Sequence, residues 1–119
     1  MNELIAPHGK EKILKPLLVT GFEKSSLENR AQQLKKCYMT SRETSDCIML
    51  GIGAFTPLDG FMNQSDWKNV CDNFTLSDGT FWPIPITLSV SSEQAHSYGD
   101  NEEIALYDEE TNELIAIMQ

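Results

Sequence analysis

Hydrophobic positions recur at helical spacing in three segments within the first two-thirds of the chain. Residues 26–36 carry one apolar stripe, formed by Leu27, Ala31 and Leu34 at i, i+4 and i+7. Residues 40–50 carry a second stripe, and Gly51 is placed to end that helix. A third short helix is predicted after Ser65, with apolar positions at Trp67, Val70, Cys71 and Phe74.

Helix starts are marked by residues that can satisfy free backbone N–H groups. Ser25 and Glu28 have capping-box spacing, in which each side chain bonds the other residue's backbone N–H. Thr40 and Glu43 repeat this spacing. Ser65 is expected to cap the third helix.

Alternating apolar positions predict strands, chiefly in the last third of the chain. Residues 84–90 give the clearest alternation, and Pro85 restricts that strand to an edge or a bulge. Residues 103–107 and 114–118 are predicted to form a hairpin, and residues 37–39 a brief strand. Helices followed by strands indicate an α+β fold with three short helices and a small curved sheet.

Composition is that of one soluble globular domain. The chain has 119 residues, of which 40% are hydrophobic and 23% charged. No apolar run approaches the roughly 20 residues that span a bilayer, so no membrane association is expected. The first residues lack the pattern of a secretion signal, and the cytoplasm is the expected compartment. The sequence stops at Gln119 directly after an apolar strand, and we expect it to be truncated within its domain.

Charge is unevenly distributed along the chain. Residues 1–68 hold nine basic and eight acidic side chains, whereas residues 69–119 hold ten acidic and no Lys or Arg side chains, which together give the net charge of −9. An acidic surface repels a phosphate backbone, so nucleic acid is not expected as a partner. The acidic half is expected to be a solvated face; a docking face for a basic partner is the alternative.

Three cysteines, Cys37, Cys47 and Cys71, have spacings that match neither a zinc site nor a disulfide framework. Cys47 and Cys71 fall on the predicted apolar helix faces. We therefore expect all three to be buried, reduced thiols.

Three candidate catalytic or ligand-binding motifs favour structural roles. Residues 51–53 (Gly-Ile-Gly) lack the further residues of a phosphate loop, and a tight turn is favoured. His8 and His96 have no metal-site spacing. Ser89, Ser91 and Ser92 near His96 lack a nucleophile elbow.

Two further groups also favour structural roles. Residues 108–113 contain four acidic side chains, but their spacing is not that of a calcium loop, and a solvated turn is expected. The aromatic residues that could stack on bases are expected to pack in the core instead; they are Trp67, Phe74, Phe81 and Trp82. The residues alone thus indicate an acidic α+β domain without a reaction.

Two longer segments are more specific to one protein family than any of the motifs above. Residues 53–62 (Gly-Ala-Phe-Thr-Pro-Leu-Asp-Gly-Phe-Met) are similar to a signature of the ATP sulfurylases (sulfate adenylyltransferases). Residues 76–88 (Leu-Ser-Asp-Gly-Thr-Phe-Trp-Pro-Ile-Pro-Ile-Thr-Leu) resemble a second signature of that family. Shorter matches are residues 4–9, residues 40–43 with Asp46, and residues 104–108.

This resemblance covers nearly the whole chain and implies the N-terminal PUA-like domain of such an enzyme, spanning residues 1–119, with a small β-barrel. The full-length family joins ATP, held with Mg²⁺, and sulfate into adenosine 5′-phosphosulfate and pyrophosphate, or runs the reverse reaction. It is commonly homo-oligomeric. Its Q-x-R-N and H-x-x-H motifs lie in a catalytic domain that would be the missing partner. Neither motif occurs here.

We therefore assign no catalytic, cofactor-binding or metal residue, and expect the chain alone to be inactive. The alternatives left open are a free-standing PUA-like binding module and a structural, oligomerisation domain. The residues expected to be mainly buried are Phe55, Leu58, Phe61, Trp82, Ile84, Ile86 and Leu106.

Overall fold

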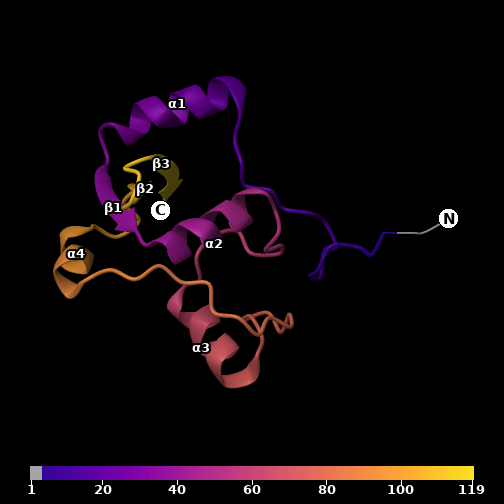
Figure 1. The fold of residues 1–119 in the computed structure, drawn as a ribbon. Coiled ribbons are helices and arrows are strands. Elements are labelled where there is room, and N and C mark those ends of the chain that lie inside the picture. The colour runs from indigo at the N-terminus through magenta and orange to yellow at the C-terminus, as the bar shows by residue number, and fades with distance from the viewer. Residues whose placement is uncertain (1–3) are drawn as a thin grey trace. The chain divides into compact units, whose positions relative to one another are not determined.

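The computed structural model describes residues 4–119 and has the expected α+β composition (Figure 1). It contains four helices and three strands among these residues, one helix more than predicted. In chain order the elements are α1 (Gly21–Ala31), β1 (Lys35–Met39), α2 (Ser41–Gly51), α3 (Gln64–Asn73), α4 (Ser92–Ser97), β2 (Ile104–Asp108) and β3 (Leu114–Met118).

The chain divides into two compact units, each described here by itself. The first unit comprises Met1–Leu17 and Met49–Thr87, and the second comprises Leu18–Ile48 and Leu88–Gln119. No helix within residues 4–119 is long and apolar enough to cross a membrane.

The second unit is built on a three-stranded mixed sheet in the order β1-β2-β3. Strand β1 is parallel to β2, and β3 returns antiparallel to β2 as the predicted hairpin. All five residues of the central strand β2 are buried, which fits a strand covered on both faces. Among the residues that the structure describes, this sheet has three strands and does not close into the barrel that the resemblance implied.

Helix α1 packs an apolar cluster against this sheet, but its position differs from the prediction. It runs over Gly21–Ala31 instead of residues 26–36, so Ser25 lies inside the helix and forms no capping box. Lys35 and Lys36 belong instead to β1, because pairing with β2 overrides the local helical spacing. Ala31 still packs as expected, together with Leu34, Ala105, Tyr107, Leu114 and Ile117.

Helix α2 confirms its capping box, whereas α3 and α4 begin at caps that were not predicted. In α2 the Thr40 N–H donates to Glu43 Oε1 at 3.0 Å, and the Glu43 N–H donates to Thr40 Oγ1 at 3.2 Å. In α3 the cap is Asn63, not Ser65: its side chain accepts a 2.8 Å bond from the Asp66 N–H. The unpredicted α4 has a capping box at Ser91 and Gln94.

The first unit surrounds one core cluster of buried aliphatic residues. Its members are Leu50, Leu58, Val70, Leu76 and Ile86, with Phe55, Phe61, Met62 and Trp82 packed against them half-buried. The predicted burial of Leu58, Ile86 and, in the second unit, Leu106 is thus confirmed. Phe55, Phe61 and Trp82 are only partly buried.

Residues 84–90 correct the clearest strand prediction. The segment is neither helix nor part of a sheet; Pro83 and Pro85 lack the N–H groups that a ladder needs. The Ile86 carbonyl instead accepts a 2.8 Å bond from the Met62 N–H. Ile86 is buried, but Ile84 is 58% exposed, so its predicted burial was wrong.

The cysteines are all free, as expected, but their burial differs. Cys37 is buried, Cys47 is half-buried, and Cys71 is exposed on α3. The predicted burial of Cys71 was therefore wrong, because the buried face of α3 is centred on Val70.

Candidate functional site

The signature segment after α2 forms a tight loop centred on Thr56 in the first unit. The buried Thr56 hydroxyl donates to the Gly53 carbonyl at 2.7 Å and accepts a 3.0 Å bond from the Lys15 N–H. Gly53 has a φ of +81°, and a Cβ there would lie 3.2 Å from the Pro16 nitrogen. The glycine therefore serves a tight turn against the N-terminal segment, and this packing supports the structural interpretation of residues 51–53.

The N-terminal segment around His8 is fixed to the second signature. His8 Nε2 lies 2.6 Å from the Phe81 carbonyl oxygen, and Lys10 Nζ donates to the Asp78 carbonyl. Between them, Gly9 has a φ of +116°, and a Cβ there would lie 2.9 Å from Pro57 Cβ. A side chain at Gly9 would thus clash with the first signature loop as well as strain the backbone.

Trp82 joins both signatures by aromatic packing. Its ring meets Phe55 edge-on, with centroids 5.8 Å apart and planes at 81°, and lies 6.1 Å from the His8 ring. Its indole N–H donates to the Ile84 carbonyl at 2.7 Å. An edge-to-face aromatic pair contributes about 0.5–1.5 kcal/mol beyond area burial. The two segments that carry the family resemblance therefore form one packed assembly.

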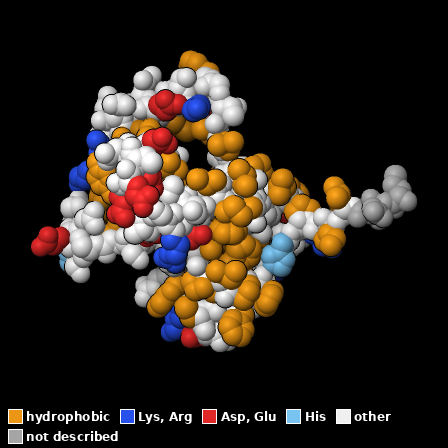
Figure 2. All heavy atoms as spheres, viewed as in Figure 1, with side chains coloured by type: hydrophobic (Ala, Val, Ile, Leu, Met, Phe, Trp, Pro, Cys, Tyr) orange, Lys and Arg blue, Asp and Glu red, His pale blue; other side chains and the backbone are white. Residues whose placement is uncertain are grey.

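Exposed apolar side chains border this assembly. Phe74, Phe81 and Ile84 are 58%, 59% and 58% exposed, and we call these three residues the aromatic surface. The backbones that carry Phe74 and Phe81 run side by side, because Thr75 forms an antiparallel bridge with Phe81 and the backbone N–H of Trp82 donates to the Phe74 carbonyl at 2.7 Å. Ile84 lies two residues further along, where its carbonyl accepts a bond from the Trp82 indole N–H. Figure 2 shows hydrophobic side chains gathered on the visible face over α3 and the loops beside it.

The chemistry of the aromatic surface fits a protein contact. None of its three side chains can act as an acid, a base, a nucleophile or a metal ligand. Grouped exposed apolar side chains on a folded domain mark interaction sites, because leaving them in water is costly. Core packing had been predicted for Phe74 and Phe81, and the structure corrects this. Trp67, which is 45% exposed, departs from the same prediction.

The candidate catalytic residues occupy structural positions. His96 lies in α4, where its Nδ1 is 2.6 Å from the Ser92 carbonyl, and Ser91 caps the same helix. Ser89 gives its backbone N–H to Glu43. Within residues 4–119, no group of three or more His, Cys, Asp or Glu side chains is placed to hold a metal ion.

The acidic turn at residues 108–113 differs from expectation at Asp108. This carboxylate is buried, accepting bonds from the Thr44 hydroxyl at 2.8 Å and from both the N–H and the hydroxyl of Thr111 at 2.9 Å. Hydrogen bonding from Thr44 and Thr111 lowers the pKa of Asp108 below its ordinary value. Asp108 thus orders the hairpin turn and is not a solvated group.

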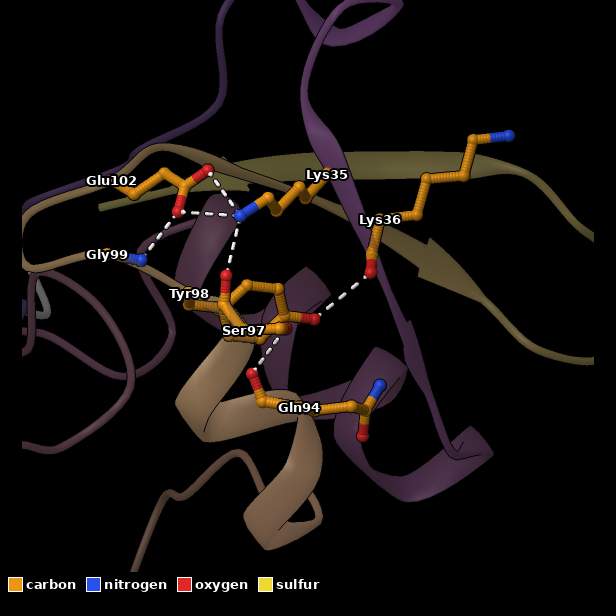
Figure 3. Close-up of polar contacts among 7 residues, drawn as sticks. All are labelled: Lys35, Lys36, Gln94, Ser97, Tyr98, Gly99 and Glu102. Carbon is orange, nitrogen blue, oxygen red and sulfur yellow. Dashed lines mark hydrogen bonds and ion pairs between the residues drawn. The ribbon is translucent and has the colours of Figure 1, made fainter.

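A second polar cluster lies beside β1 in the second unit (Figure 3). Lys35 Nζ donates to the Ser97 carbonyl at 2.5 Å and lies 3.3 Å from a Glu102 carboxylate oxygen. The other Glu102 oxygen accepts a 2.6 Å bond from the Gly99 N–H. The Lys35 charge is therefore engaged within the protein and is not directed at an external anion.

The sequence analysis did not predict that the buried carboxylates of Glu43 and Asp108 bond residues far away in the sequence. Glu43 was predicted only as a capping residue, yet it also bonds Ser89, 46 positions away. A signal was available: an acidic residue inside a mainly apolar segment, as in Ile-Ala-Leu-Tyr-Asp at residues 104–108, is usually paired when buried. The partner of each carboxylate could not be found from spacing.

Known proteins match this chain along nearly its whole length. A family model described as a PUA-like domain matches residues 5–119. The chain is 59% identical over 119 residues to a sulfate adenylyltransferase of Syntrophobacter fumaroxidans, and 57% identical over 116 residues to one of Chlorobaculum tepidum. These alignments cover 100% and 98% of this chain but 29% of each relative, so the chain spans less than a third of their length.

Among solved structures, the chain is similar to one described as a hexameric APS kinase from Thiobacillus denitrificans. The TM-score is 0.82 at 30% sequence identity, and the match covers 97% of this chain and 22% of that chain.

Proposed function

We propose that this chain, which belongs to the PUA-like domain family, is the N-terminal accessory domain of a sulfate adenylyltransferase. The observation that carries the proposal is the match along the whole chain to less than a third of much longer relatives with that name. The aromatic surface supports it, because such a surface is expected where a domain contacts the rest of its protein.

In this proposal, the residues that carry out the reaction lie outside this chain, in the catalytic domain. Joining ATP and sulfate brings two polyanions together, and fixed cations and N–H donors must converge on them, with Mg²⁺ on the nucleotide. Several cations of this chain are already engaged internally: Lys10 with Asp78, Arg30 with Glu103 at 2.8 Å, and Lys35 with Glu102. The accessory domain would instead support the catalytic domain through apolar contact.

Two further properties are proposed for the longer protein. We propose that it forms homo-oligomers, with support from the hexameric solved relative. We place it in the cytoplasm, with support from the free thiols of Cys37, Cys47 and Cys71, since paired cysteines are typical of oxidising compartments.

A chimeric enzyme tests the proposal. Residues 1–119 would replace the matching segment of the Syntrophobacter fumaroxidans enzyme, and sulfate-dependent release of pyrophosphate from ATP would be measured. We expect the chimera to turn over within about tenfold of its parent, because the two segments are 59% identical and an apolar contact tolerates substitutions of similar size. The relative lacking its segment is the matched control and should be much less active.

Two outcomes oppose the proposal. Sulfate-dependent turnover by residues 1–119 alone, above a heat-treated control, would reveal a site in this chain and remove its accessory role. A correctly folded chimera without turnover would instead favour a free-standing binding module or an oligomerisation domain.

A further inference from the structure

Two of the seven glycines in the chain directly follow an aspartate, at Asp59-Gly60 and at Asp78-Gly79. An Asp-Gly pair is chemically labile, because a glycine has no side chain to keep its backbone nitrogen away from the carboxyl carbon of the aspartate before it. Both aspartates are exposed, so access to water does not distinguish them. The hydrogen bonds around the two pairs do.

The reaction of such a pair needs no reactant except water. The glycine nitrogen attacks the side-chain carboxyl carbon of the aspartate; a C–N bond forms, and the N–H hydrogen leaves with the carboxyl O–H as one molecule of water. Water then opens the resulting succinimide ring at either of its two carbonyl carbons. One opening restores aspartate, and the other gives isoaspartate, whose backbone is longer by one methylene. No atom is oxidised or reduced.

The Asp78-Gly79 pair is held by its turn. Asp78 Oδ1 accepts a 2.9 Å bond from the Thr80 N–H, a local bond that aspartate often forms in turns. The Gly79 N–H donates to the Leu76 carbonyl at 2.9 Å. The attacking nitrogen and the attacked carboxylate are therefore both engaged, and both bonds must break before the ring can close.

The Asp59-Gly60 pair is not held in this way. Within residues 4–119, neither the Asp59 carboxylate nor the Gly60 N–H forms a hydrogen bond. A Cβ placed on Gly60 would meet no atom within 4 Å, so the space beside this glycine is open. Ring closure at this pair breaks no bond that the fold has made.

We infer that Asp59 is a site of spontaneous isomerisation to isoaspartate in the folded protein, and that Asp78 is protected from it. Breaking one hydrogen bond to a charged group is enough to slow a reaction about tenfold or more. The inference goes beyond the proposed function and does not depend on it, because it concerns only bonds inside the first unit.

The place of Asp59 in the first signature gives this change a structural consequence. The Leu58 N–H donates to the Phe55 carbonyl and the Met62 N–H donates to the Ile86 carbonyl, each at 2.8 Å, so the backbone is fixed on both sides of the pair. A backbone lengthened by one methylene between these two bonds is expected to displace at least one of them. Leu58 and Met62 both pack in the first unit's core, so the isomerised protein should unfold at lower urea concentration.

Peptide mapping by mass spectrometry tests the inference. Residues 1–119 would be kept for weeks at physiological temperature in heavy-oxygen water, which leaves one heavy oxygen at each ring opening, and electron-transfer fragmentation would identify isoaspartate. In the native chain we expect Asp59 to react about tenfold faster than Asp78 or more. In urea the ratio should fall to about one, because the Thr80 and Leu76 bonds that protect the second pair are lost.

Asp59→Glu is the matched variant. It keeps the negative charge, but its longer side chain would need a larger ring that closes far more slowly. We expect no heavy oxygen at position 59 of this variant and an unchanged slow reaction at Asp78. Heavy oxygen that still enters at position 59 at the natural rate would overturn the inference, since it would arrive by a route other than the succinimide.

The rates at the two pairs in folded protein decide the result. Equal rates at Asp59 and Asp78 in the native state, or a faster reaction at Asp78, would overturn the inference. The urea transition of residues 1–119 shows whether that sample is folded, and the chimera described above provides the same measurement if it is not. A folded chimera in which Asp59 forms no isoaspartate would also overturn the inference, whether or not that chimera is active.

Discussion

Glu43 accepts a 2.7 Å hydrogen bond from the backbone N–H of Ser89 through one carboxylate oxygen, while its other oxygen caps α2. The side chain is 97% buried, given its 3% relative exposure, so this carboxylate ties the start of a helix to a segment 46 positions later. Hydrogen bonds to a buried charged group each contribute about 1.5–3 kcal/mol.

We expect Glu43→Ala to lower the free energy of unfolding by about 2–4 kcal/mol, because the Ser89 N–H and the Thr40 cap lose their acceptor together. Urea unfolding of residues 1–119 measures this. Glu23→Ala, at an exposed position in the first turn of α1, is the matched control and should change stability by under about 0.5 kcal/mol. Equal losses from the two substitutions would contradict the bridging role.

Asp108 should make stability depend on pH on the acid side. Hydrogen bonding from Thr44 and then Thr111 lowers its pKa in the folded state, so its contribution is full above the ordinary Asp pKa. That contribution is lost as pH falls through the lowered folded pKa. The stability difference between the natural chain and Asp108→Asn is therefore expected to be largest near neutrality and to shrink on acidification.

Urea unfolding at a series of pH values checks this, with Asp59→Asn at an exposed position as control. A stability difference between the natural chain and Asp108→Asn that stays constant from neutral to acid pH would contradict this prediction. It would show that the bonds from Thr44 and Thr111 do not depend on the negative charge of Asp108.

The three thiols should react in a defined order. Cys71 is exposed, whereas burial raises the pKa of Cys47 to about 11 and also raises the pKa of Cys37. Because the thiolate is the reacting form, iodoacetamide near neutral pH should label Cys71 first. Mass spectrometry should find one label on the native chain and three in denaturant. Rapid labelling that persists in Cys71→Ser would mean that Cys47 or Cys37 is accessible.

Local patterns predicted local structure well. The capping box of Thr40 and Glu43 joins residues three apart, and the hairpin of β2 and β3 joins strands close in sequence, so spacing alone indicated both. The end of α1 was misplaced because Lys35 and Lys36 pair with Ile104 and Ala105, and no spacing rule contains a parallel partner so distant.

The candidate site was predicted only in part for the same reason. Both signature segments were recognised, but their packing through His8, Phe55 and Trp82 depends on tertiary contact. The aromatic surface was expected to be core, because apolarity does not distinguish a residue buried in its own domain from one that another domain covers.

Ile84 and Ile86 allow a paired test of the segment in which alternating apolar residues predicted a strand that the structure does not contain. The two residues should share one face of a strand, yet Ile86 is 1% exposed and Ile84 is 58% exposed. Ile86→Ala is expected to cost about 2–5 kcal/mol, because it leaves a cavity in the first unit's core. Ile84→Ala should cost under about 0.5 kcal/mol in the isolated chain. Similar losses for the two variants, measured by urea unfolding, would mean that both side chains are buried on one face of a regular strand, which contradicts the structure.

Phe81 offers the most direct test of the aromatic surface. Its side chain is 59% exposed, while its carbonyl oxygen holds His8, so a side-chain substitution leaves that backbone contact in place. In residues 1–119 alone, Phe81→Ser should therefore change the free energy of unfolding by under about 0.5 kcal/mol. In the chimera the same change should cost about 2 kcal/mol or more, since an aromatic side chain at the centre of a contact is often a hot spot.

Phe22→Ser is the matched control for this substitution. Phe22 is 90% exposed on α1 in the second unit and lies outside the aromatic surface, so the same change of residue type there should have a small effect in both proteins. Thermal unfolding and pyrophosphate release would be measured for both variants in the chimera. A Phe81 variant as stable and active as the Phe22 variant would show that the longer protein does not cover Phe81. A large loss of stability for Phe81→Ser in the isolated chain would show instead that Phe81 packs within its own unit, because no other domain is present there to contact it.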